Sequence, residues 1–247
     1  MKILLLTDPT TTSEFVSEVV NIQQSISGPV EIDSVPEGVL LFEDSSSTAS
    51  MTDYSELSWP EIISGMQQYR SDYAISEDYY LFLLSERPND RKWFSFGDGM
   101  KNHYIHIAEW ERFIKAPGQL PVSFLIAGNV LLEAIFSELD DLLANAHQTV
   151  RGCLSDLCIN KTEISLKLRT ADLCPECMER LNNAVSEDKL TGGEAQDLLN
   201  ILESVRAQLL YRERFSLEMK PSRLTVKGYR RKLILEDLGG VQLDLNP

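Results

Sequence analysis

The four cysteines are the strongest constraint on how this chain folds, because all of them fall within 25 residues of one another, at Cys153, Cys158, Cys174 and Cys177. Two pairs of thiolates, separated by 15 residues and with the second pair in a Cys-Pro-Glu-Cys turn, match the ligand spacing of structural zinc. We therefore predict one zinc ion held by these four side chains. A closed four-sulfur site leaves no coordination position for water, so this metal is expected to organise the fold and not to activate a nucleophile.

The alternatives to a zinc site are two disulfides or four unrelated buried thiols. A chain of 247 residues with 43% apolar content can bury a sizeable core without disulfides. The first ten residues, MKILLLTDPT, hold an apolar run only from Ile3 to Leu6, too short for a signal peptide or a membrane span. We therefore expect a cytoplasmic protein with no membrane segment. A reducing compartment favours thiolate ligands over disulfides.

The formal net charge of −15 argues against general nucleic-acid binding, because phosphates would be repelled over most of the surface. The charge is uneven. Residues 211–232 contain eight Lys or Arg and two Glu, a net of +6, which leaves −21 on the rest of the chain. This basic segment could contact an acidic partner, or it could neutralise the acidic body as a solvated face.

The N-terminal third predicts alternating strands and helices. Residues 3–6 form a continuous apolar run, residues 15–26 carry apolar side chains at helical spacing, and residues 30–32 alternate with polar neighbours. This order predicts a βαβ unit. Two helix starts have capping-box spacing, Thr11 with Glu14 and Ser58 with Glu61. We further expect a helix over 59–73 and strands over 79–84, 93–96 and 103–107, with a polar loop over 43–53.

The rest of the chain predicts longer helices and a β-rich end. One helix is expected over 121–147 and another around 198–209, followed by strands at 223–226, 232–235 and 241–245. The predicted fold class is α/β, with a mixed sheet and flanking helices. We expect one domain over 1–215, including a zinc knuckle over 152–180, and a small β-rich C-terminal appendage over 216–247.

The order of several segments resembles one peptidase family. The chain contains the runs LFLLSE, WFSFGD and NHYIHIAEW, followed by a long helix and a cysteine segment ending in CPEC. In these features the chain resembles archaemetzincins, a branch of the metzincin zinc peptidases. In that family the active-site helix carries HExxHxxGxxH, a Cys follows the third His, a second Cys comes after four residues, and a CxxC comes later. The four cysteines of this chain fit the cysteine part of that family pattern. The resemblance covers about residues 79–180 and implies a metzincin-like core.

The catalytic half of the family motif is missing. With Cys153 as the anchor, Leu142, Leu143, Ala146 and Gly152 stand at the first His, the Glu, the second His and the third His. A zinc peptidase needs two imidazoles one helical turn apart and a carboxylate that activates water. The resemblance therefore implies a pseudoenzyme with no catalytic residues, a non-catalytic zinc-binding protein that acts through a protein partner.

Other functions remain open as alternatives. An active zinc-dependent hydrolase could be built from His147 with Glu138 or Asp141, although no two of the three histidines have helical i, i+4 spacing. A nucleotide or another anion could bind the hydroxyl-rich turn over 7–12, which lacks glycine fingerprints, so we assign no cofactor-binding residue. Nucleic acid could bind the knuckle and the basic segment, where aromatic side chains are interspersed with cations.

Two further groups of residues have two interpretations each. Trp93, Phe94 and Phe96 could line a pocket beside Gly97, or they could simply pack a strand under the long helix. Asp156 and Lys161 lie inside the cysteine segment. They could form hydrogen bonds with the sulfur ligands, or they could pair with each other at the surface.

Overall fold

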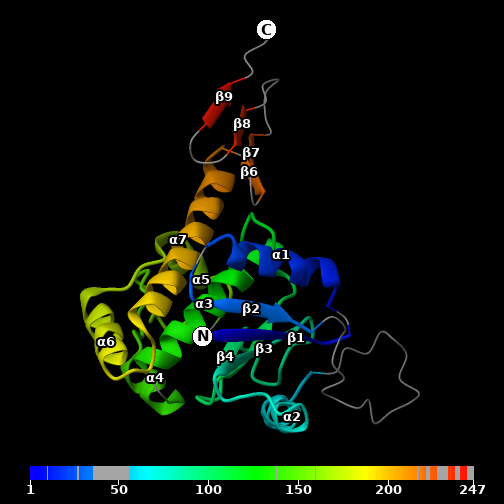
Figure 1. Ribbon diagram of the computed structural model, residues 1–247, viewed down its shortest axis with the longest axis vertical. Helices are drawn as coiled ribbons and strands as arrows, with labels where there is room; N and C mark the ends of the chain where they lie inside the picture. The colour runs from blue at the N-terminus through cyan, green and yellow to red at the C-terminus, as the bar shows by residue number, and fades with distance from the viewer. Residues whose placement is uncertain are drawn as a thin grey trace.

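The structure is a computed structural model that describes residues 1–9, 11–26, 28–35, 56–136, 138–158, 160–215, 217–220, 223–226, 233–236 and 240–243. The polar loop predicted over 43–53 lies outside these residues. The main body is built on a five-stranded sheet with helices on both faces (Figure 1). The predicted α/β class with a mixed sheet is confirmed.

The strand order in the main sheet is β2-β1-β3-β5-β4. Four strands are parallel: β1 (Lys2–Thr7), β2 (Glu31–Ser34), β3 (Tyr79–Ser85) and β5 (Asn102–His106). The edge strand β4 (Ser95–Gly97) runs antiparallel to β5 and is joined to it by a short connection over 98–101. The apolar runs form the central strands because these are buried on both faces.

The two faces of the sheet belong to two separate apolar clusters. Ile3 and Leu5 pack with α1 (Ser13–Gln24) and other helices, whereas Leu6 packs with α2 (Trp59–Asp72) on the opposite face. The alternation follows from the period of two in a strand. The capping box of Ser58 with Glu61 is formed as predicted. The one predicted at Thr11 with Glu14 is wrong by one residue, because Thr12 is the N-cap of α1 and its hydroxyl accepts the backbone N–H of Phe15.

The helix predicted over 121–147 is in fact two helices. α3 (Gln119–Ile135) is followed by α4 (Leu139–Asn145), and the two are bent by 90°. Phe136 turns into the core at the end of α3 and is 2% exposed. Among the described residues no single helix is long and apolar enough to cross a membrane, and only this bent pair meets both criteria when taken together. The break releases His147 from the helical register.

Apart from a short 3-10 helix, the remaining helices begin within the cysteine segment or after it. The short 3-10 helix Trp110–Arg112 precedes α3, and α5 (Ile164–Thr170), α6 (Pro175–Ser186) and α7 (Gly192–Phe215) come later. α7 packs along α3. Beyond it stands an antiparallel sheet ordered β6-β7-β8-β9, at the C-terminal end of α7 in Figure 1.

This C-terminal sheet contains one strand that the sequence analysis did not predict. β7 (Arg223–Val226), β8 (Leu233–Glu236) and β9 (Gly240–Leu243) match the three expected strands within a residue or two over the described positions. β6 (Leu217–Lys220) is additional and pairs with β7.

Candidate metal centre

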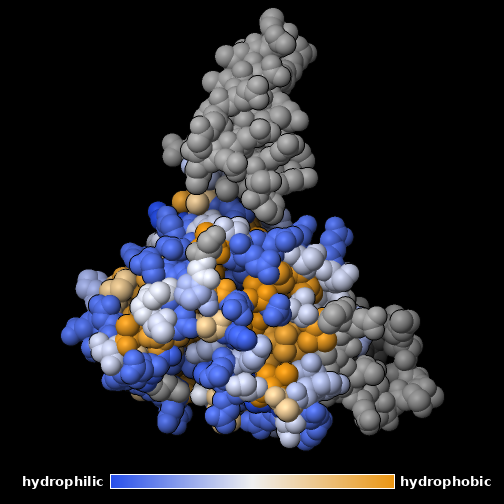
Figure 2. Space-filling model, viewed as in Figure 1, coloured by the Kyte–Doolittle hydropathy of each residue, from blue (hydrophilic) through white to orange (hydrophobic). Residues whose placement is uncertain are grey.

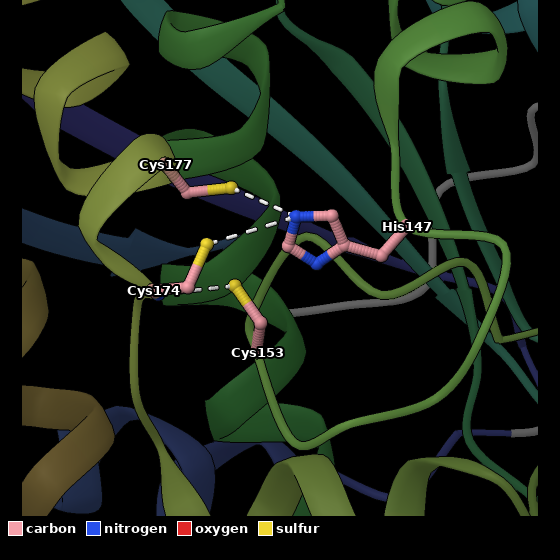
Figure 3. A group of neighbouring side chains, drawn as sticks. All are labelled: His147, Cys153, Cys174 and Cys177. Atoms are coloured by element: carbon pink, nitrogen blue, oxygen red, sulfur yellow. Dashed lines mark hydrogen bonds between the residues drawn. The ribbon is translucent and has the colours of Figure 1, made fainter.

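Four side chains converge beside the N-terminus of α6, and their ligand atoms all lie within 4.8 Å of one another. Figure 3 shows His147, Cys153, Cys174 and Cys177 pointing toward a common centre. His147 follows α4, Cys153 lies in the next loop, and the other two belong to the first turn of α6. Three of the predicted ligands are thus brought together. Cys158 lies outside the group, and His147 stands in its place.

The spacing of these atoms matches a tetrahedral zinc site. His147 Nε2 lies 3.4 Å from Cys177 Sγ and 3.7 Å from Cys174 Sγ. Zinc bonds of ordinary length to nitrogen and sulfur, set at a tetrahedral angle, would separate N and S by about 3.6 Å. Three cysteines and one histidine are also a donor set that structural zinc uses. The cluster can therefore hold one zinc ion.

Backbone hydrogen bonds hold the two cysteine loops together. Leu154 N donates to Asp172 O at 2.7 Å, and Cys174 N donates to Cys153 Sγ at 3.3 Å. The path of the chain requires a positive φ at Gly152, +93°, and at Ala171, +47°. These contacts place the loop sulfur against the start of α6, where Pro175 occupies the first helical turn.

Asp156 orients the histidine ligand. Its Oδ1 lies 3.0 Å from His147 Nδ1, and its Oδ2 accepts the backbone N–H groups of Arg151 at 2.7 Å and Gly152 at 2.6 Å. The Asp156 side chain is 0% exposed. A carboxylate on Nδ1 keeps the proton there and leaves the Nε2 lone pair for a metal. Neither of the two interpretations of this residue holds, because its side chain contacts the histidine and the backbone, and not a sulfur atom or Lys161.

The cysteines differ in how readily they ionise without metal. Burial raises the pKa of the Cys177 thiol to about 12. Burial also opposes ionisation of Cys174, but hydrogen bonds from Cys177, together with the nearby Arg151 guanidinium, lower the pKa of this thiol overall. A metal ligand must be the thiolate, so zinc binding would release protons from this cluster.

Cys158 belongs to the wall of a neighbouring cavity. Burial raises the pKa of its thiol. The same cavity is lined by Lys167, whose Nζ donates to Asp156 O at 2.9 Å and whose pKa is lowered by burial. Trp93, Phe94, Phe96 and Gly97 also line it, so the pocket interpretation of these aromatics holds alongside their packing role.

The three histidines occupy three separate environments. His103 Nε2 lies 2.9 Å from Glu133 Oε2 at the cavity, whereas His106 points away, with Nε2 3.0 Å from Glu86 O. Strand residues three positions apart face opposite sides of a sheet, which accounts for the two orientations. Lys161 Nζ lies 3.2 Å from His106 Nδ1 and donates to Ala108 O, so its pairing with Asp156 is not observed.

The alternative sites receive little geometric support. Asp141 accepts a hydrogen bond from Asn145 at 2.7 Å, and Glu138 is exposed at the cavity rim, so neither joins His147 in the metal-ligand cluster. In the hydroxyl-rich turn, the buried Asp8 carboxylate accepts both the N–H and the hydroxyl of Thr11, at 3.2 and 3.0 Å. A carboxylate in that position repels an anion.

Sequence reasoning missed His147 as a ligand because it treated the histidine as part of a continuous helix. The available signal was its position six residues before Cys153, close enough in the chain to reach the same metal.

Comparisons with known proteins give one distant structural neighbour. No protein-family model matches the chain, and no curated protein matches it in sequence. The neighbour is the crystal structure of a zinc-dependent peptidase from Methanocorpusculum labreanum (strain Z). It is 12% identical, the match covers 73% of this chain and 100% of that chain, and the TM-score is 0.42. A likeness of this size does not establish a family.

Proposed function

We propose that this chain is a non-catalytic zinc-binding protein, a metzincin-like pseudoenzyme that acts through a protein partner. The observation that carries the proposal is the convergence of His147 with three cysteines at tetrahedral spacing. Four protein ligands complete the coordination of zinc, and a completed site has no open position at which water could be activated. The role of the metal here would be structural, to cross-link separate segments of the chain.

Zinc in this cluster would connect the loop after α4, the Cys153 loop and the start of α6. Structural zinc binds with an apparent free energy of about 10–16 kcal/mol in zinc-finger peptides. One zinc with three thiolates and a neutral imidazole carries a single net negative charge. The buried Lys167 ammonium is attracted by the Cys153 and Cys158 sulfurs and by Asp156, and it would balance that charge.

The residues at the family's catalytic positions support a non-catalytic role. Leu142 and Leu143 line the cavity wall, and Ala146 is buried beside them. Aliphatic side chains neither bind a second metal nor deprotonate water. The resemblance to metzincins, taken together with the missing catalytic groups, thus supports a scaffold that binds a partner and catalyses no reaction.

A partner with a basic surface suits the charge of this chain. The formal net charge is −15, and complementary potentials speed association and favour correct partners. Figure 2 shows hydrophilic residues over much of the drawn face, with apolar surface gathered over the region of β1 and β2.

The test is the zinc stoichiometry of the purified protein by native mass spectrometry, with a matched pair of cysteine variants. We expect one zinc in the wild type and in Cys158→Ser, and none in Cys174→Ser or His147→Ala. Loss of zinc from Cys158→Ser with retention in His147→Ala would instead support the four-cysteine set. Casein cleavage by the zinc-loaded protein that disappears in His147→Ala would establish the hydrolase alternative and refute the proposal.

A further inference from the structure

A cavity of roughly 310 Å³ lies between the edge strand β4, helices α3 and α4, and the loop over 155–158. Most of its wall is apolar. The aliphatic and aromatic side chains that face it from the helices are Leu125, Leu132, Phe136, Leu139, Leu142 and Ile164. Ligand sites in proteins commonly combine an enclosed apolar wall with a few polar groups, and this volume suits a small organic molecule.

The polar part of the wall is a buried imidazole and carboxylate with unused hydrogen-bonding capacity. His103 is 3% exposed, and the Glu133 side chain is 12% exposed. Glu133 Oε1 accepts the backbone N–H of Lys101 at 3.1 Å. Its Oε2 lies 2.9 Å from His103 Nε2, an ion-pair distance, and within the described part of the chain neither atom makes a hydrogen bond. An unsatisfied buried carboxylate oxygen favours a ligand that brings a donor.

The imidazole is held rigidly at this wall. Its ring stacks on Phe82 with centroids 4.6 Å apart and planes inclined by 13°. Space for the ring depends on Gly97, where a Cβ atom would lie 2.5 Å from His103 Nδ1. The two polar groups are therefore fixed before any ligand arrives, which lowers the entropic cost of binding.

The charges around the cavity favour a cation. Asp156 is already engaged by His147 and two backbone N–H groups, and Lys167 donates to Asp156 O beside the sulfur cluster. Glu138 adds a carboxylate at the rim. Glu133 is left as the buried anion that faces the apolar space. The His103 imidazole lies against its Oε2, and the Arg70 guanidinium also interacts with this carboxylate electrostatically.

We propose that this cavity binds a small organic amine, with the ammonium group on Glu133 Oε2 and an apolar body against the α3 and α4 side chains. An ammonium supplies the donor and the positive charge that the carboxylate lacks, and a charge-assisted hydrogen bond is stronger than a neutral one. This ligand site goes beyond the zinc-dependent scaffold role, because its polar groups are not metal ligands.

The test compares three probes that share one aromatic body: 2-phenylethylamine, 2-phenylethanol and 3-phenylpropanoate. Isothermal titration calorimetry at neutral pH and low salt should show the amine binding at least about tenfold more tightly than either of the others. Glu133→Gln keeps an acceptor for the Lys101 N–H but removes the charge, and it should abolish the preference. Glu138→Gln removes a charge at the exposed rim and should retain it.

A second variant locates the binding. Leu142→Trp fills the cavity from α4 and should weaken the amine at least about tenfold while zinc content stays unchanged. With the wild type, the proposal is overturned if the three probes bind equally, if the carboxylate binds most tightly, or if no probe binds. With the variants, it is overturned if Glu133→Gln keeps the amine preference or if Leu142→Trp binds the amine as tightly as the wild type does. None of these outcomes depends on whether the zinc is structural, so they separate this inference from the proposed function.

Discussion

At the scale of single residues, Asp156 organises more of the metal centre than any ligand does. One carboxylate accepts from His147 Nδ1–H when the proton is there, and it also accepts from the backbone of Arg151 and Gly152, immediately before Cys153. The histidine and the first cysteine are thereby positioned by the same buried side chain. Such outer carboxylates raise the basicity of a histidine ligand and reduce its rotational freedom.

Replacement of this carboxylate should weaken zinc binding without removing a ligand. We expect Asp156→Asn to lower zinc affinity by about 10- to 100-fold, because the amide no longer favours the Nδ1–H tautomer or carries the charge. Competition with a chromophoric chelator measures the change. Asp140→Asn, an exposed change in α4, is the control and should bind zinc as the wild type does. Equal affinities in the two variants would show that Asp156 has no such role.

His106 makes stability depend on pH. Burial, and then the Lys161 charge, lower its pKa from 6.5 to about 4. The unfolded state therefore binds a proton more readily, and stability is lost as pH falls from 6.5 toward 4. Wild type should lose about 2 kcal/mol more than His106→Gln across this window. Urea unfolding at several pH values measures this difference, and parallel pH profiles would contradict the assignment.

At the scale of elements, two backbone positions with positive φ lie where the Cys153 loop meets the C-terminal end of α5. Gly152 has φ +93° and would place a Cβ 2.7 Å from Thr170 Cγ2, whereas Ala171 ends α5 with φ +47°. Only glycine adopts such angles without steric cost. Position 152 thus has glycine, the residue that its conformation favours, whereas position 171 has alanine, which pays a steric cost there.

Exchanges at these two positions should change stability in opposite directions. Gly152→Ala should lower the free energy of unfolding by about 1–3 kcal/mol through backbone strain and the clash with Thr170. Ala171→Gly should raise it by about 0.5–1 kcal/mol by relieving the left-handed strain. Denaturant unfolding of the zinc-loaded variants measures both changes. Two destabilising results would mean that Ala171 contributes packing that outweighs its strain.

Element prediction succeeded where the signal was local and failed where it was not. The capping box at Ser58 and the buried strand runs depend on neighbouring residues, and the structure contains them. The long helix was wrong because its apolar period continues past position 135. The chain bends there as Phe136 enters the core formed with α3, a long-range contact that periodicity does not encode.

At the scale of the whole molecule, the metal centre and the cavity share one wall. The segment from Ala146 to Cys158 carries two ligands of the cluster and also contributes five lining residues of the cavity: Ala146, Ser155, Asp156, Leu157 and Cys158. The opposite wall belongs to β4 and α3, and α3 packs against α7. Zinc at the cluster would therefore hold one side of the cavity against the sheet.

The α/β class, the main strands and most helices were predictable from the sequence, because local periodicity and capping encode them. Ligand spacing also predicted a cysteine cluster that could hold zinc, but it included all four cysteines. In the structure His147 joins three of them, and Cys158 lines the cavity instead. The physical reason is that the bend after α3 and the buried Asp156 orient the imidazole. Both depend on tertiary contacts that the local periodicity of the sequence does not encode.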